Sequence, residues 1–367
     1  MSKSCTLAVV LLFLFFSTNS ASASYHFSNF KGKPPIHIYK GASSKPNGGF
    51  TPAQIKSFYG LPATGGHGTI VIIGAYDDAT LEKDLNTFST QFALPACTTV
   101  NGCFTKHAMT AGIKANTGWA GETSLDVEWA HAIAPSAKIL IVEATTPSGA
   151  NLLKAIDYAD TVSDASAISM SWGGGEFPEE LTLDSHFKNV AGAPYFASSG
   201  DNGAGASWPA SSPFVIGVGG TTITLKTDKT FSKETAWTGS GGGVSAYEKQ
   251  PAFQSGYSIP KANGMRAIPD VSYDADPASG FPIVRNGKWY EVGGTSAGAP
   301  QWAGIAALSP VGSGINIANL YADKGGSNAQ YFRDITTGSN GDCGYFCTAR
   351  KHYDYITGLG SPLGDKF

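Results

Sequence analysis

The chain has 367 residues, of which 42% are hydrophobic and only 14% are charged, so it can build one large core. A net charge of −3 and a pI near 6.2 argue against a nucleic-acid-binding function, and no basic run favours a membrane surface. The 46 glycines follow no period, which excludes collagen-like and low-complexity sequences.

Residues 1–23 have the pattern of a secretory signal peptide. Lys3 supplies a positive charge, TLAVVLLFLFF is too short to span a bilayer, and Ala21-Ser22-Ala23 offers a cleavage site. An uncleaved anchor is the lesser alternative. We therefore expect a protein that is secreted, or delivered to an acidic compartment on the same route. Residues 24–48 are polar, with Pro and Gly, and predict an extended arm before a main domain at 49–367.

From residue 49 on, short apolar runs alternate with helical segments such as TLEKDLNTFSTQF and NLLKAIDYADTV. This alternation predicts an α/β fold whose mostly parallel central sheet carries helices on both faces. Such sheets place their chemistry at the carboxyl ends of the strands. Residues 221–290 are richer in turns and predict hairpins and long loops. The predicted strands are 69–76, 138–144, 167–172, 193–200 and 214–220.

Four cysteines follow the predicted signal, and an exported chain can oxidise them. Their spacing suggests two local loops, Cys97 with Cys103 and Cys343 with Cys347, although four cysteines allow three pairings. A metal cluster is less favoured, because neither pair has CxxC spacing and no paired histidine accompanies them.

The segment GETSLDVEWAHAIAP, residues 121–135, predicts a helix that ends at a proline. Glu122 and Asp126 are four residues apart and share one helical face, beside an apolar stripe. Two carboxyls against apolar surface cannot both ionise easily, so one should hold a proton. Glu122 could then serve as a base that Asp126 orients. The alternative is that both acids are solvated on the outer face of the helix.

Asp201 lies in YFASSGDNGAG, where a predicted strand runs into a glycine-rich turn. An acid at the carboxyl end of a strand is well placed for function. When protonated, its O–H could donate to an oxyanion. A turn-capping aspartate is the alternative.

Ser296 lies in GGTSAGAPQWAGIAAL, where glycines permit a tight turn before an apolar helix. A serine hydroxyl needs a base before it becomes a nucleophile. His67, in HGT, precedes the first strand and reads as a surface-loop residue. The other histidines considered have no catalytic flanking motif and are expected to be solvated or structural: His107, His131, His186 and His352.

Ten collinear motifs from about residue 50 to the C-terminus resemble the sedolisin family, the serine-carboxyl peptidases of subtilisin-like fold. They are FTPAQIKSFYGLP, GETSLDVEWAHAIAP, ISMSWGGGE, FASSGDNGA, WPASSPFVIGVGGT, ETAWTGSGGGVSAY, IPDVSYDADPASGFPI, GGTSAGAP, FRDITTG and YITGLGSP.

The resemblance implies that Ser296 is the nucleophile, that Glu122 is the general base and acid, and that Asp126 supports Glu122. It puts Asp201 in the oxyanion hole, with the backbone N–H of Ser296 as the second donor. It also puts Trp172 beside the substrate cleft, although a core tryptophan under a loop is the alternative. Family members usually carry a long prosegment, whereas here only residues 24–48 separate the predicted signal from the first motif.

The resemblance further implies one structural calcium ion near the C-terminus, bound through Asp334, Ile335 and Asp354. The family pattern has glycines where this chain has Arg350 and His352, so a loop that has lost calcium is the alternative.

The leading hypothesis is thus a secreted endopeptidase that acts in acid on peptides or unfolded proteins. We expect a monomer with no nucleic-acid or membrane partner. A non-catalytic binding, defence or storage protein on the same scaffold, or an exopeptidase that releases tripeptides, are the alternatives.

Overall fold

The computed structural model describes residues 26–309, 315–322 and 331–364. The predicted signal peptide lies outside these residues. Within the described ranges, no helix has the length and hydrophobicity needed to cross a bilayer.

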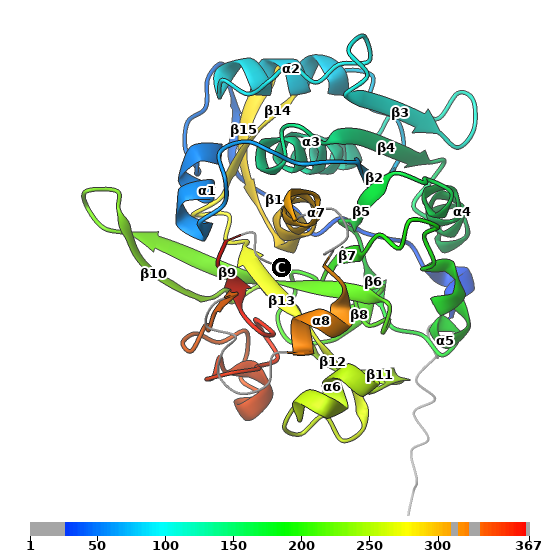
Figure 1. Cartoon of the computed structure of the whole chain (residues 1–367), viewed down its shortest axis with the longest axis vertical. Coiled ribbons are helices and arrows are strands. Elements are labelled where there is room, and N and C mark those ends of the chain that lie inside the picture. Colours follow the sequence, from blue (N-terminus) through cyan, green and yellow to red (C-terminus); the bar gives the residue numbers. More distant parts are fainter. Residues whose placement is uncertain (1–25, 310–314, 323–330, 365–367) are drawn as a thin grey trace, which may run out of the picture.

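A central sheet of eight strands forms the framework of the described chain, as the sequence predicts (Figure 1). Its strands are parallel except for the edge strand β10, which pairs antiparallel with β9. The order is β10 (Phe231–Ala236), β9 (Val215–Leu225), β7 (Tyr195–Ser198), β5 (Ala165–Met170), β2 (Thr69–Ala75), β4 (Lys138–Ala144) and β3 (Phe104–Ala108), with β13 (Val271–Asp274) also paired to β9.

Both faces of this sheet are buried, which explains why the strands read as continuous apolar runs. Successive side chains point to opposite faces. On β2, Ile70 and Ile72 enter one core, whereas Val71 and Ile73 enter the other. The first core holds α3 (Thr117–Ile133) and α7 (Gly298–Leu308), and the second holds α4 (Gly149–Asp160), on opposite sides of the strands in Figure 1. The predicted α/β fold with helices on both faces is therefore confirmed.

The predicted strands and helices agree with the structure to within a few residues, and 221–290 forms hairpins as expected. The remaining elements are α1 (Pro52–Tyr59), α2 (Leu81–Gln91), α5 (Glu180–Leu183), α6 (Ala252–Tyr257), α8 (Ile317–Ala322), β6 (Gly174–Gly175), β8 (Ser207–Trp208), β11 (Gly243–Lys249), β12 (Met265–Ile268), β14 (Phe281–Arg285), β15 (Lys288–Gly293), β16 (Phe332–Arg333) and β17 (Ser361–Pro362).

The predicted arm is packed against the main domain. It contains a short 3-10 turn, η1 (Phe27–Asn29), and a strand, β1 (His37–Ser43), that pairs antiparallel with β15 in a separate sheet of three strands. The two predicted disulfides, Cys97–Cys103 and Cys343–Cys347, are confirmed.

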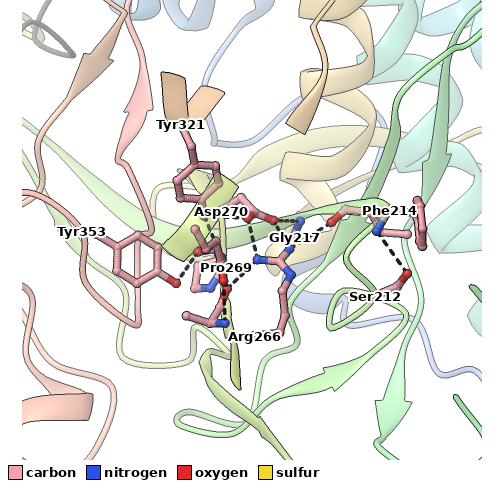
Figure 2. Close-up of polar contacts among 11 residues, drawn as sticks. Ser212, Phe214, Gly217, Arg266, Pro269, Asp270, Tyr321 and Tyr353 are labelled. Carbon is pink, nitrogen blue, oxygen red and sulfur yellow. Dashed lines mark hydrogen bonds and ion pairs between the residues drawn. The ribbon is translucent and has the colours of Figure 1, made fainter. Parts of the chain in front are cut away.

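A fully buried ion pair fixes the segment between β12 and β13 (Figure 2). Arg266 Nη2 lies 2.6 Å from Asp270 Oδ2, and the hydroxyl of Tyr321 donates to Asp270 Oδ1 at 2.7 Å. The hydroxyl of Tyr353 donates to the carbonyl of Pro269 at 3.0 Å. Since Tyr321 and Tyr353 belong to C-terminal segments, this network joins them to the sheet.

Candidate active site

Helix α3 begins at the cap residue Asn116, whose side chain accepts from the N–H groups of the first turn, and it ends just before Pro135. Helix α3 is buried more completely than the predicted apolar stripe indicates, because every residue from Trp119 to Ile133 is buried. Glu122 and Asp126 are each only 1% exposed. The alternative in which both acids are solvated is therefore wrong.

Glu122 lies beside the predicted nucleophile, Ser296. Ser296 lies in the 3-10 turn η3 (Thr295–Ala297), which leads into α7, and it is buried. The nearby Ser296 hydroxyl lowers the pKa of Glu122. Among the described residues, however, neither Ser296 Oγ nor the carboxyl oxygens of Glu122 form a hydrogen bond of normal geometry. The predicted grouping of Glu122, Asp126 and Ser296 is thus present.

Burial dominates the electrostatics of the pair. It raises the pKa of Glu122 well above its usual range, and the neighbouring charge of Asp126 raises it further. Burial likewise raises the pKa of Asp126, against a hydrogen bond from Ser171 that lowers it. A state in which both carboxyls are ionised is therefore disfavoured in this buried pair.

Asp201 follows β7 and is anchored to the nucleophile's turn. Its Oδ1 accepts from the backbone N–H and the hydroxyl of Thr295, at 2.8 and 2.7 Å. Burial raises its pKa, which favours the protonated form that an oxyanion donor needs. Gly294 leaves room for this contact: its φ is +126°, and a Cβ there would lie 2.4 Å from Asp201 Oδ2.

The N-terminal arm enters the same site. Nε2 of His37 lies 3.0 Å from Asp201 Oδ2, and the carbonyl of Pro35 would lie 2.0 Å from a Cβ at Gly294. Upstream, Lys33 and Gly173 exchange antiparallel backbone hydrogen bonds of 3.0 and 3.2 Å. Sequence reasoning did not identify His37, because no catalytic pattern surrounds it.

A cavity of about 620 Å³ lies between the arm and the strand ends. Arm residues 33–37 line one side, and glycine-rich segments 173–175 and 199–207 line the other. The exposed backbone of such segments can pair with an extended peptide.

Trp172 is fully buried, and its indole N–H donates to the carbonyl of Ile73 at 3.0 Å. Its ring also packs edge-on against Phe30. These contacts favour the alternative of a core tryptophan under a loop for the Trp172 side chain. It is the following residue, Gly173, that lines the cavity.

The structure supports a non-catalytic role for two of the histidines, His67 and His131. His67 lies before β2, where Nε2 contacts the carbonyl of Ser309 at 2.8 Å, away from Ser296. His131 is buried beside the Cys97–Cys103 disulfide. Oxidation removes those two sulfurs as metal ligands.

The predicted calcium residues lie on two facing loops. The N–H of His352 donates to Asp334 Oδ2 at 2.9 Å, and the N–H of Arg350 donates to Asp354 Oδ2 at 3.1 Å. His352 has φ +67°, a conformation that favours glycine. The loop therefore keeps a glycine-like shape without glycine. Two carboxylates and nearby carbonyls form a donor set that suits calcium.

Comparison with known proteins gives a consistent picture. Residues 101–310, which contain all four predicted catalytic residues, match the Subtilase family. The chain is 30% identical to kumamolisin of Bacillus sp. over 350 residues, covering 86% of this chain and 62% of kumamolisin. It is 32% identical to tripeptidyl-peptidase sed4 of Aspergillus fumigatus over 234 residues, covering 47% of this chain and 37% of that protein. The chain thus spans less than two thirds of either relative.

Among solved structures, that of Pseudomonas sedolisin, a serine-carboxyl proteinase complexed with two molecules of pseudo-iodotyrostatin, is similar to this one. The TM-score is 0.74 at 28% sequence identity, and the match covers 86% of this chain and 95% of that chain.

Proposed function

The chain belongs to the sedolisin family of subtilisin-like serine peptidases, and on that premise we propose that it is an acid-acting serine-carboxyl endopeptidase. The observation that carries the proposal is the buried Glu122–Asp126 pair beside Ser296. A glutamate base takes the role that histidine has in other serine peptidases.

In the proposed reaction, Ser296 Oγ attacks the scissile carbonyl while Glu122 accepts the hydroxyl proton. The carbonyl oxygen becomes an oxyanion, which the N–H of Ser296 and the protonated carboxyl of Asp201 stabilise. Glu122 then returns the proton to the leaving amine, and an acyl-enzyme remains on Ser296. A water molecule then attacks the acyl-enzyme, with Glu122 again as the base, and the second product is released. Asp126 keeps Glu122 oriented throughout.

This mechanism requires two protonation states at once. Glu122 acts as a base only when ionised, whereas Asp201 donates only when protonated. Both conditions hold together only over an acidic range, so an acidic optimum follows.

We expect extended peptides or unfolded proteins as substrates, because the cavity offers glycine backbone on one side. Asp334 and Asp354, with the carbonyl of Ile335 and those of residues 350 and 352, would hold one calcium ion. When bound, calcium would cross-link the two C-terminal loops. Secretion, or delivery to an acidic compartment of the secretory route, remains part of the proposal, as does a monomeric state.

Two observations keep other functions in view. The arm contacts Asp201 and borders the cavity, which is the arrangement expected if the scaffold were a non-catalytic binding, defence or storage protein. Similarity to a protein named as a tripeptidyl-peptidase favours exopeptidase activity instead. The lengths of the products from a defined peptide would separate endopeptidase from exopeptidase.

The proposal is tested by cleavage of an acid-unfolded protein between about pH 3 and 7, with calcium present, comparing the chain with its Ser296→Ala variant. Cleavage that is confined to acid and abolished by the substitution would support a peptidase. No cleavage by either folded protein would favour the non-catalytic alternative.

A further inference from the structure

The hydroxyl of Ser171 connects the acid pair to the nucleophile's backbone. Ser171 directly follows β5 and is buried. Its Oγ donates to Asp126 Oδ1 at 2.6 Å, and it lies 3.2 Å from the carbonyl oxygen of Ser296. A hydroxyl has one proton and two lone pairs, so it donates mainly to one of these oxygens at a time. The shorter distance identifies the Asp126 carboxyl as the main acceptor.

We propose that Ser171 is a positioning residue for the acid pair, because its hydroxyl can satisfy the Asp126 carboxyl in both protonation states. This inference rests on the proposed function and deepens it. When Asp126 is ionised, the Ser171 O–H donates to it. When Asp126 is protonated, its O–H donates to Ser171 Oγ, and the Ser171 proton turns to the carbonyl of Ser296.

In both arrangements the Ser171 hydroxyl proton, and any proton on the Asp126 carboxyl, has an acceptor. This matters because a buried polar group without a partner costs roughly 1–3 kcal/mol. The shared proton can therefore reside on Glu122 or on Asp126 without leaving Asp126 unsatisfied. The second contact also ties the end of β5 to η3, so the acid pair and the nucleophile keep a fixed separation.

Within the described part of the chain, few charged groups act on the Asp126 carboxyl. Glu122 lies one turn earlier on α3. Asp201, which follows β7, raises the pKa of Glu122 through its charge. The hydrogen bond from Ser171 lowers the pKa of Asp126 and also that of Glu122. Without the hydroxyl both pKa values would rise, and Glu122 would stay protonated, and inactive as a base, up to a higher pH.

The chain offers matched controls. Ser169 is also buried, on β5 two residues before Ser171, and its Oγ has no hydrogen-bond partner among the described residues. Ser171→Thr and Ser171→Val place side chains of nearly equal shape at one position, and only threonine keeps a hydroxyl.

The experiment measures kcat and KM for a peptide substrate from about pH 3 to 7, with the melting temperature of every variant recorded at each pH. For Ser171→Ala and Ser171→Val we expect kcat to fall roughly 10- to 100-fold at unchanged KM. We also expect the acidic limb of the profile to move upward by about one pH unit. Ser171→Thr should restore the wild-type limb, and Ser169→Ala should match wild type throughout.

Equal profiles for Ser171→Thr and Ser171→Val, or an acidic limb that does not move, would overturn the inference. A second readout does not depend on turnover: carbon-13 NMR titration of the Asp126 carboxyl, assigned by comparison with Asp126→Asn. If the wild-type chain cleaves nothing, the proposed function fails, but the titration still decides about Ser171. A higher midpoint in Ser171→Ala supports its role, and an unchanged midpoint rejects it.

Discussion

Nε2 of His37, on the N-terminal arm, lies 3.0 Å from Oδ2 of Asp201, the acid that follows β7. The hydrogen bond to Asp201 raises the pKa of His37, and the same contact lowers the pKa of Asp201 against the larger effect of burial. The arm thus contacts, through the imidazole of His37, the carboxyl of Asp201 that the mechanism requires as an oxyanion donor.

Replacing His37 with alanine should extend activity toward neutral pH. Asp201 donates only when protonated, and removal of His37 raises its pKa, so the alkaline limb of kcat/KM should move upward by about one pH unit. Tyr39→Ala is the matched control, because Tyr39 lies on the same strand with its side chain exposed. An alkaline limb that stays in place, or moves by the same amount in Tyr39→Ala, would argue against this coupling.

Replacing Glu122 with glutamine should remove the base while preserving its shape. We expect kcat to fall by roughly 10²- to 10⁴-fold, because proton transfer in the transition state is lost. Steady-state kinetics at the wild-type pH optimum measure this loss, and Asp342→Asn, at an exposed acid, is the control. Retention of wild-type kcat would exclude Glu122 as the base.

The same variant should become more stable than wild type as the pH rises. Below the ordinary glutamate pKa of 4.5, Glu122 is protonated in both the folded and the unfolded chain. Above it only the unfolded chain releases the proton, because burial raises the folded pKa, so wild-type stability is lost as pH rises through that range. Glutamine does not titrate. The melting temperature of Glu122→Gln should therefore exceed that of wild type near pH 7, and the difference should vanish near pH 4. A constant difference would contradict the raised pKa.

Asp270→Asn should strongly destabilise the fold, because Arg266 would remain buried with its charge uncompensated (Figure 2). Breaking such a pair costs about 3–5 kcal/mol. The exposed pair Lys138–Asp164 provides the control, since Asp164→Asn should cost less than about 1 kcal/mol. Denaturant unfolding of both variants measures the difference. Similar losses would show that the buried pair contributes no more than a surface pair.

Removal of calcium should lower the melting temperature of the chain, and Asp334→Asn should abolish that response. The reason is that the metal would join the loop after β16 to the loop that contains Asp354. Thermal unfolding with and without a chelator tests this, with magnesium as the competing ion. A melting temperature that is indifferent to the chelator would favour the alternative of a loop that has lost calcium.

Most of the framework could be predicted from sequence because strands buried on both faces leave an unmistakable apolar run, as in β2 and β4. The spacing of Glu122 and Asp126 likewise predicted a shared helical face. The periodicity of apolar residues did not predict how deeply the two acids are buried. A helix that is buried on all sides has no polar face from which its orientation could be inferred.

Other features depend on tertiary contacts that no local pattern encodes. His37 reaches Asp201 only because β1 pairs with β15, far along the chain. Trp172 was assigned to the cleft by resemblance, yet its indole N–H is used inside the core. Ser171 lies within the motif ISMSWGGGE, but a serine at a strand end gives no sign of the carboxyl that it meets.

The central claim is that a buried carboxyl pair activates Ser296, and the dependence of kcat/KM on pH tests it most directly. Measured on the wild-type chain from about pH 3 to 8, kcat/KM should follow a bell with both limbs below neutrality, as Glu122 ionises and Asp201 then loses its proton. A profile that instead rises to a plateau above neutral pH would contradict the account, because Asp201 would then have lost the proton that its role as an oxyanion donor requires.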